Sequence, residues 1–288
     1  MTNVINATYV EHPRTSYGPG DRIHKLFTIA PLDKRAGLCY NKVNIKKGLA
    51  LMIDKRIHYI IVVDTETCNG ILTDGKLDLS DSLVYDLGFA VVDKKGRVYE
   101  THSYVIKDIF YYMADAMKSA YYASKIPQYK ADIKAGTRKA VTFYEARKDL
   151  LDTMKKYHTS TIAAHNARFD YNALNVTQRY LTKSKSRYFF PYNVEIWDTL
   201  KMARQTIGKQ KSYKIFCEIH NFMTKHKVPQ VRLTAEILHR YLSGNENFEE
   251  SHTGLEDVLI EKEILAHCFR QHKKMCKNLF EKAAVALN

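Results

Sequence analysis

Five apolar runs with the composition of β-strands occur along the chain, at residues 59–63, 83–92, 97–106, 161–164 and 194–197. The first run is nearly continuous and rich in β-branched residues, which is typical of a strand buried on both faces. The second and third runs are joined by Lys94-Lys95-Gly96. A connection this short and polar predicts a β-hairpin.

Helical periodicity dominates the rest of the chain. We predict helices over about 108–124, 142–157, 169–180, 212–224, 234–242 and 253–269, and one more that Asp198-Thr199 caps. Thr142 with Glu145, and Thr253 with Glu256, have the spacing of capping boxes. The strand at 161–164 feeds directly into a helix, which indicates a parallel strand with a crossover connection. These elements predict an α/β domain.

The composition is that of a folded and strongly basic protein. Hydrophobic residues make up 45% of the chain and charged residues 26%, which suits one large core. Lys and Arg exceed Asp and Glu by 45 to 31, so the formal net charge is +14. A charge of this size attracts polyanions, and we expect nucleic acid as the partner, with anionic membrane surfaces as the alternative.

Three further features bound the organisation of the chain. No run approaches the roughly 20 apolar residues of a membrane-spanning helix, and Met1-Thr2-Asn3 lacks the apolar region of a signal peptide, so we expect a cytoplasmic protein. Residues 1–57 contain a turn at Gly18-Pro19-Gly20 and scattered basic residues without periodicity. We predict an N-terminal extension of unknown role over 1–57 and one domain over 58–288. The five cysteines show no Cys-x-x-Cys spacing, which argues against a disulfide framework and a structural zinc site.

Four acids and a histidine are the candidate catalytic residues. Asp64 and Glu66 end the first strand two positions apart, so both side chains leave the same face of the sheet. Asp170 lies one turn past Asn166, and Asp257 one turn past Thr253, two residues that can cap helices. Each of these acids is therefore delivered from the start of a helix. His252 precedes the second cap, on a loop.

These residue types suit phosphodiester hydrolysis. The attacking and leaving oxygens both develop negative charge, and two divalent cations roughly 3.5–4 Å apart can stabilise both. Such hard ions prefer oxygen ligands, so a group of carboxylates is the required chemistry. An imidazole with a pKa near 6.5 can accept a proton from the attacking water. Each motif alone also has a structural explanation, as an exposed strand end, a helix cap or a first-turn acid. Their combination in this order indicates a nuclease.

With these motifs the chain resembles the DEDDh exonucleases of the ribonuclease-H-like superfamily, over about residues 58–270. The resemblance implies a mixed five-stranded sheet, with the first three strands antiparallel, flanked by helices. The first motif of the family matches Asp64 and Glu66, the second Asp170, and the third His252 and Asp257. It implies that the four acids bind two ions of Mg²⁺ or Mn²⁺ and that His252 is the general base. The likeness is greatest to members encoded by phages and prophages of Gram-positive bacteria, which implies a bacterial or phage-infected host.

The chain departs from this family in three places. Thr67-Cys68-Asn69-Gly70 adds one residue before the glycine that follows the first motif, Gly254 stands where alanine is common, and residues 1–57 have no counterpart. The resemblance also suggests that Thr65 and Thr67 lie near the terminal 3′ hydroxyl, although strand-end threonines need no function. Asn166 is a helix cap or a substrate contact, and we interpret Asp198 as structural.

Two stretches rich in basic and aromatic residues are candidate nucleic-acid tracks. They cover residues 111–139 and 179–188. Aromatic rings can stack on unpaired bases while cations follow the phosphates. The alternative is that the tyrosines pack the core and the lysines solvate the surface.

The function expected from the sequence is a metal-dependent 3′-to-5′ exonuclease. It would release nucleoside monophosphates from single-stranded or frayed ends, with DNA somewhat preferred over RNA. The alternatives are a nuclease for short oligoribonucleotides or cyclic nucleotides, and a noncatalytic module that binds nucleic acid or associates with a polymerase. Loss of a ligand would mark the last alternative, but all four acids and the histidine are present. The sequence leaves the oligomeric state open.

Overall fold

The computed structural model describes residues 53–68, 82–118, 120, 123–182 and 187–281. The predicted N-terminal extension lies almost entirely outside the described residues, as do Asn69 and Gly70 of the first-motif loop and Lys183 and Lys185 of the second candidate track. The predicted boundary near residue 57 therefore stays a prediction.

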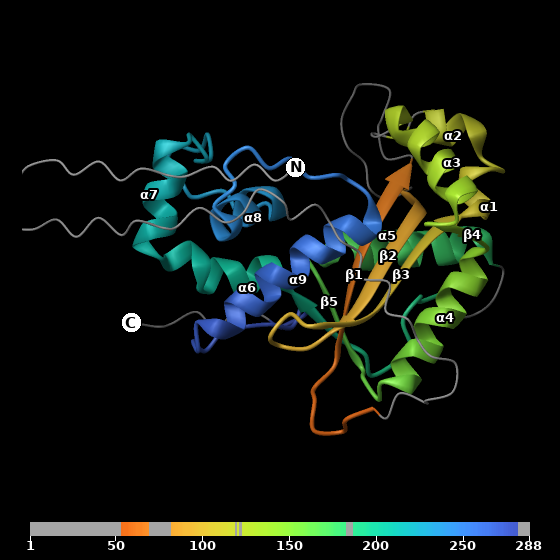
Figure 1. Cartoon of the computed structure of the whole chain (residues 1–288), viewed down its shortest axis with the longest axis horizontal. Helices are drawn as coiled ribbons and strands as arrows, with labels where there is room; N and C mark the ends of the chain where they lie inside the picture. The colour runs from red at the N-terminus through yellow and green to blue at the C-terminus, as the bar shows by residue number, and fades with distance from the viewer. Residues whose placement is uncertain (1–52, 69–81, 119, 121–122, 183–186, 282–288) are drawn as a thin grey trace, which may run out of the picture. The chain divides into compact units, whose positions relative to one another are not determined.

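A six-stranded mixed sheet forms the centre of the described domain (Figure 1). The strands are β1 Ile60–Cys68, β2 Leu83–Val92, β3 Val98–Ile106, β4 Lys139–Val141, β5 Thr161–Ala164 and β6 Glu195–Asp198, in the order β4-β3-β2-β1-β5-β6. The first three are antiparallel, while β4 is parallel to β3, β5 to β1 and β6 to β5. This confirms the predicted fold class. The additional strand β4 has three residues, too few for a periodic signal.

Helices cover both faces of this sheet. On one side are α1 Lys107–Phe110, α2 Ala114–Lys118, a 3₁₀ turn at Ala123–Lys125, α3 Ile126–Ala135, α4 Phe143–Lys156 and α5 Arg168–Leu181. On the other are α6 Thr199–Gln205, a 3₁₀ turn at Ile207–Lys209, α7 Lys211–Ile219, α8 Ala235–Ser243 and α9 Gly254–Arg270. None of the helices in the described ranges is long and apolar enough to cross a bilayer.

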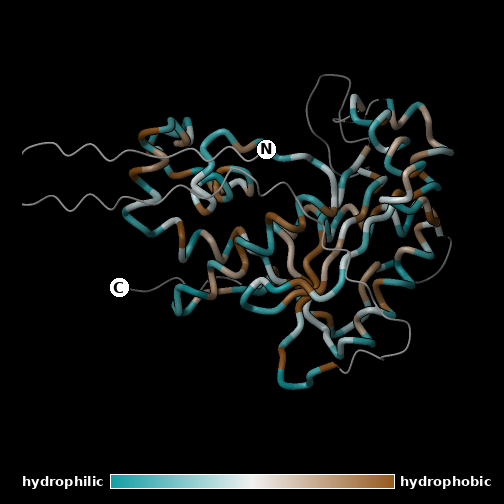
Figure 2. Tube along the Cα trace, viewed as in Figure 1, coloured by the Kyte–Doolittle hydropathy of each residue, from teal (hydrophilic) through white to brown (hydrophobic). Residues whose placement is uncertain are grey.

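Strand β1 separates two apolar cores by its alternation. Ile61 and Val63 pack into the core under α1–α5, whereas Ile60 and Val62 pack into the core under α6–α9. The apolar colouring of the trace is concentrated in these central strands (Figure 2). Because side chains of a strand alternate between faces, Asp64 continues the Ile60 and Val62 series. The first predicted acid therefore leaves the sheet toward α9.

The helix starts differ in how they are capped. Thr142 and Glu145 form the predicted capping box, and Asp198 caps α6 by accepting from the N–H groups of Leu200 and Lys201. The predicted cap at Asn166 is wrong, because Asn166 has a left-handed backbone (φ 61°) and Ala167 occupies the cap position of α5. The predicted box at Thr253 is also wrong. Thr253 makes no side-chain cap bond to the backbone of α9, and its own N–H donates to Asp257.

Candidate active site

The carboxyl end of β1 opens into a cavity of about 1140 Å³. Asp64, Glu66, Asp257 and His252 line this cavity, and they come from β1, from α9 and from the loop before α9. One ligand atom from each of Glu66, His252 and Asp257 lies within 4.8 Å of the others, a spacing at which they could hold a metal ion. The structure thus brings together residues that are almost 200 positions apart in the sequence.

Asp170 is held at the site by β1. The Oδ1 atom of Asp170 accepts hydrogen bonds from the backbone N–H of Thr65 at 3.1 Å and from its hydroxyl at 2.8 Å. Because α5 begins just after β5, the parallel neighbour of β1, its first turn arrives beside the end of β1. The observed role of Thr65 is to orient this carboxylate. Substrate contacts of Thr65, Thr67 and Asn166 stay predictions, although Thr65 and Asn166 line the cavity.

Asp257 and His252 are positioned by the start of α9. The two carboxylate oxygens of Asp257 accept from the backbone N–H of Thr253 at 3.1 Å and from the hydroxyl of Ser251 at 3.3 Å. His252 has a left-handed backbone (φ 49°), and its Nδ1 lies 3.8 Å from Oε2 of Glu250. Lys125 donates a hydrogen bond to the backbone carbonyl of Ser251. Through Lys125, the first candidate track (residues 111–139) therefore contacts the loop that carries His252.

Two glycines let α9 approach the sheet. A Cβ atom on Gly254 would lie 2.6 Å from the backbone N of Gly88 in β2, and one on Gly88 would lie 2.2 Å from the carbonyl carbon of Gly254. Neither position has room for a side chain. The backbone N–H of Gly254 donates to Oδ2 of Asp86 at 2.9 Å, also in β2. The lack of space for a Cβ atom therefore explains why this chain has glycine rather than alanine at position 254.

A buried ion pair secures the same junction. Asp86 and Arg138 are 0% and 5% exposed, and Nη1 of Arg138 lies 3.2 Å from Oδ2 of Asp86. Nη2 of the same guanidinium donates to Glu256 in the first turn of α9 at 2.7 Å. The hydroxyl of Tyr129 donates to Asp86 at 2.7 Å. Tyr129 thus packs in the core, which is the alternative to nucleic-acid binding considered for the first candidate track. The side chains of Tyr111, Tyr112, Tyr180 and Tyr188 are exposed.

The acids of the site repel one another. Burial, and then the neighbouring carboxylates, raise the pKa of Asp64 well above its ordinary value and that of Glu66 to about 9. Burial raises the pKa of Asp257 to about 8. It also raises the pKa of Asp170 to about 7, although the hydrogen bonds from Thr65 act to lower it. Burial, and then the charge of Lys125, lower the pKa of His252, so its imidazole is neutral at pH 7.

Sequence reasoning missed two further acids of this cavity, Glu250 and Glu261. Burial raises the pKa of Glu250 to about 7, and Glu250 is the main charged neighbour that raises the pKa of Asp257. Glu261 lies one turn after Asp257 on α9 and is 3% exposed. Its spacing of four residues from Asp257 was the available signal, because residues i and i+4 share a helix face. We call Asp64, Glu66, Asp170, Asp257 and Glu261 the acidic cluster.

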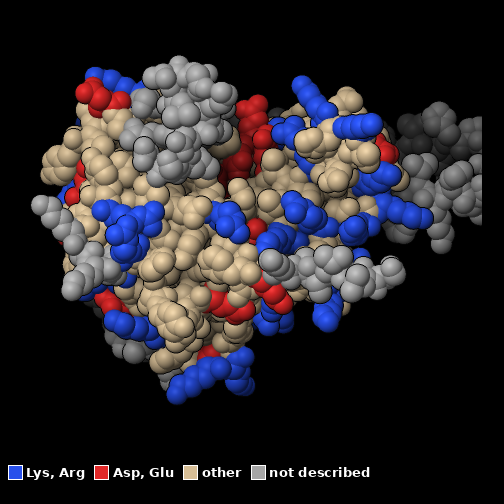
Figure 3. Space-filling model, turned by 180° about the vertical axis from the view of Figure 1, so that it is seen from behind, with Lys and Arg blue, Asp and Glu red and all other residues tan. Residues whose placement is uncertain are grey.

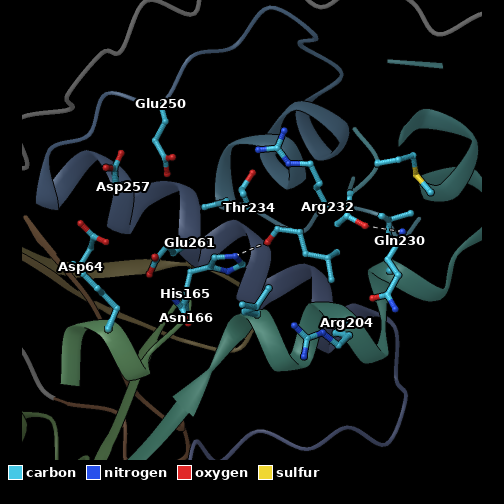
Figure 4. A pocket seen from close by; sticks show the side chains of 18 of the residues that line it. Asp64, His165, Asn166, Arg204, Gln230, Arg232, Thr234, Glu250, Asp257 and Glu261 are labelled. Atoms are coloured by element: carbon cyan, nitrogen blue, oxygen red, sulfur yellow. Dashed lines mark hydrogen bonds between the residues drawn. The ribbon is translucent and has the colours of Figure 1, made fainter. Parts of the chain in front are cut away.

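The other end of the cavity is cationic. Figure 4 shows Asp64, Asp257 and Glu261 at one end and Arg204 and Arg232 at the other. We call this second end the cationic arm, and it consists of Arg204, Lys209, Lys214 and Arg232. Within the described ranges only Lys214 of these four forms an ion pair, with Glu218 at 3.8 Å. In Figure 3, acidic side chains gather in a hollow beside a lobe with many Lys and Arg side chains on its surface.

The acidic cluster fits hard divalent cations. It offers carboxylate oxygens, the ligands that Mg²⁺ and Mn²⁺ prefer. In the part of the chain that the structure describes, none of its five members forms an ion pair with Lys or Arg, so their charge is not compensated by a side chain. One oxygen, Oε2 of Glu261, is buried with no hydrogen-bond partner among the described residues. A bound cation would supply the missing positive charge.

Comparison with protein-family models and with curated proteins gives no match. Among solved structures, the chain is similar to the nuclease domain of 3′hExo, a DEDDh family member bound to rAMP. The identity is 13% and the TM-score 0.47, over 78% of this chain and all of that one. It is also similar to E. coli exonuclease I with single-stranded DNA (13%, TM-score 0.42, 75% of this chain and 42% of that one). A third similar structure is exonuclease X with 5′-overhanging duplex DNA (17%, TM-score 0.33, 73% and 91%). At these identities and TM-scores the likenesses carry no functional assignment, and the proposal below rests on the geometry of the site.

Proposed function

We propose that the protein is a metal-dependent 3′-to-5′ exonuclease that releases nucleoside monophosphates from single-stranded or frayed ends. The observation that carries this proposal is the meeting of Asp64, Glu66, Asp257 and His252 at one end of one cavity, where Thr65 holds Asp170 behind them. Uncompensated carboxylates can hold divalent cations and a neutral imidazole can accept a proton, and these are together what metal-assisted hydrolysis of a phosphodiester requires.

Each residue of the site has a proposed role. Asp64, Glu66, Asp170 and Asp257 would hold two divalent cations, Mg²⁺ or Mn²⁺. When bound, these ions stabilise negative charge on the attacking and leaving oxygens of the phosphodiester. Thr65, Thr253 and Ser251 fix the carboxylates of Asp170 and Asp257 by hydrogen bonds, so these carboxylates are oriented before a ligand arrives.

His252 is the proposed general base. Its imidazole is neutral at pH 7, and its Nδ1 faces the carboxylate of Glu250. We assign Nε2 as the atom that accepts the proton of the attacking water. Glu250 then stabilises the imidazolium that forms, because a carboxylate near the other ring nitrogen favours the charged state.

The cationic arm is the proposed path of the substrate strand away from the scissile phosphate. Arg204, Lys209 and Arg232 have no ion-pair partner within the described ranges, so their charge is available to phosphates. A polyanion lying along the cavity would place one phosphate at the acidic cluster and others along the arm. This arrangement supports a strand rather than a small phosphate ester as the substrate.

A digestion assay with end-labelled substrates tests the proposal. Single-stranded DNA, duplex DNA, RNA and dinucleotides of matched sequence are incubated with the full chain and Mg²⁺ or Mn²⁺. We expect mononucleotides from the 3′ end, with DNA degraded somewhat faster than RNA, and no reaction in EDTA. Asp64→Asn and Asp257→Asn should abolish digestion. Asp152→Asn is the matched control, because Asp152 is a surface acid on α4 that pairs with Lys148 and Lys155.

Circular single-stranded DNA distinguishes an exonuclease from an endonuclease. Cleavage of the circle, or release of nucleotides from the 5′ end, would refute the proposal. His252→Ala should lower kcat by roughly 10²–10⁴ with little change in KM, as expected for loss of a general base. Wild-type turnover in this variant would reject the role of His252 while leaving the metal site in place.

A further inference from the structure

Glu261 is a buried acid without an assigned role. Its residue is 3% exposed, and it lines the cavity from the second turn of α9. Oε2 of Glu261 has no hydrogen-bond partner among the described residues, and the carboxylate forms no ion pair with Lys or Arg in that part of the chain. Isolated buried carboxylates are rare in folded proteins, because water no longer solvates their charge.

The surroundings of Glu261 are acidic. It is the charged neighbour that most raises the pKa of Asp64, and Asp170 is the one that most raises its own. In Figure 4 the side chains of Asp64 and Glu261 lie near each other, on the side of the cavity where His165 also lies. Glu261 thus lies near Asp64 and is within reach of the charge of Asp170, whereas the 4.8 Å group of Glu66, His252 and Asp257 does not include it.

An apolar residue would serve this helix position better if only packing mattered. The neighbours of Glu261 on α9, Val258, Ile260, Ile264 and Leu265, are buried and apolar. A carboxylate among them costs stability unless a cation compensates it, and no Lys or Arg of the described ranges does so. Among the described residues no side chain supplies this positive charge, and a bound cation would supply it.

We propose that Glu261 is a fifth carboxylate of the divalent-cation site, acting on the ion that Asp64 and Asp170 hold. This inference rests on the proposed function. It assigns to the chain a site with five acids in place of the four of the sequence motifs. Glu66, His252 and Asp257 form the other side of the same site.

A structural role for Glu261 is the competing explanation. The backbone N–H of His165 donates to the Glu261 carboxylate, and His165 begins the short loop that leads into α5, the helix that carries Asp170. Glutamine separates the two roles, because its amide oxygen can still accept from this N–H but carries no charge. A positioning role is therefore preserved in Glu261→Gln, whereas a cation-binding role is lost.

The experiment measures Mn²⁺ binding to the full chain by calorimetry and by the loss of the free-ion EPR signal. Four proteins are compared: wild type, Glu261→Gln, Glu261→Leu, and Glu263→Gln as the control. Glu263 is on the same helix, has a side chain 41% exposed and pairs with Lys262. We expect Glu263→Gln to bind like wild type and both Glu261 variants to bind one Mn²⁺ roughly 10–100-fold more weakly. Melting temperatures without metal should not fall in Glu261→Gln.

Three results would overturn the inference. Wild-type Mn²⁺ affinity in both Glu261 variants would remove any role in binding, and wild-type affinity in Glu261→Gln alone would assign the residue to positioning. No Mn²⁺ binding by the wild type would overturn the inference together with the proposed function. If the wild type binds Mn²⁺ and Glu261→Gln weakens it, but 3′ ends are not degraded, only the proposed function fails.

Discussion

Replacing Gly254 by alanine tests how the active site is assembled. Gly254 is the first residue of α9, and its backbone lies against Gly88 of β2 and the carbonyl of Asp64. An added Cβ would meet the backbone N of Gly88 at 2.6 Å and its Cα at 3.2 Å. Both contacts are with backbone atoms, which cannot rotate away. The start of α9 must therefore move away from the sheet.

The displacement can be estimated from the contact distances. Moving the nearest contact from 2.6 Å to the ordinary distance of 3.4 Å requires a shift of about 0.8 Å. His252 and Asp257 flank Gly254 in sequence, so both move relative to Asp64 and Glu66. A misplacement of about 1 Å can lower the rate of a catalysed step by roughly 10²-fold. Overpacking of this kind also costs about 1–3 kcal/mol of folding stability.

The assay combines turnover with stability. We expect kcat for 3′-end digestion to fall by roughly one to two orders of magnitude in Gly254→Ala, with a lower urea midpoint. Gly88→Ala should be more severe, because its Cβ would lie 2.2 Å from Gly254. The control is Gly208→Ala, at a cavity-lining glycine where the nearest atoms to a new Cβ are at 3.4 Å. Wild-type turnover and stability in Gly254→Ala, or equal effects at all three glycines, would refute this reasoning.

Three other perturbations probe the charges around the site. Arg138→Met leaves Asp86 buried without its cation and should lower the free energy of unfolding in urea by about 3–5 kcal/mol. The double variant Arg138→Met with Asp86→Asn should recover part of this loss. A single variant as stable as the wild type would contradict the role of the ion pair. Two acids of the cluster have a pKa raised to about 8 and about 9, so the metal-free fold binds more protons than the unfolded chain. Its stability should therefore fall by about 4 kcal/mol as the pH rises from 7 to 9, through these pKa values. Mg²⁺ should remove this loss, and a flat pH profile in EDTA would count against the charge repulsion. Joint replacement of Arg204 and Arg232 by alanine should raise KM for oligonucleotides. It should also reduce the slope of log KM against log salt concentration by about 1.4, at roughly 0.7 per phosphate contact. Lys148→Ala is the control, and an unchanged slope would show that the strand does not contact these two arginines.

The strands and the motif acids were predictable because their signals are local. An apolar run followed by two acids, and acids in the first turn of helices, are readable within a few residues of sequence, although β1 does not end at the two acids as predicted but continues to Cys68. The hairpin at Gly96 and the helices α4, α5, α8 and α9 follow from the same short-range patterns. β4 was missed because three residues carry no period, and α7 ends at Ile219, before the predicted end at 224.

The contacts that assemble the site were not predictable in the same way. Asp86 looks like an acid in the middle of a strand, and Arg138 like one of many surface cations, until the fold brings them together under α9. Glu261 precedes Lys262 and Glu263 in sequence, so it reads as part of a solvated face unless its spacing of four residues from Asp257 is considered. Gly88 did carry a signal, since a glycine inside a strand often marks close approach of another backbone. The structure was needed only to identify Gly254 as the residue whose backbone approaches Gly88.

The two wrong cap predictions concern the two helices that carry acids of the cluster in their first turn, and at these helix starts the placement of the acid replaces side-chain capping. Helices α4, α6 and α8 have side-chain caps at Thr142, Asp198 and Thr234, and none of them delivers an acid of the cluster. Helices α5 and α9 deliver Asp170 and Asp257 and have no side-chain cap. In both, a first-turn carboxylate already supplies negative charge near the positive end of the helix dipole. Helices α3 and α7 also lack side-chain caps and deliver no such acid, so a missing cap alone does not mark a site. At α9 the N–H of Thr253 donates to Asp257, so the start of the helix orients the carboxylate proposed as a metal ligand.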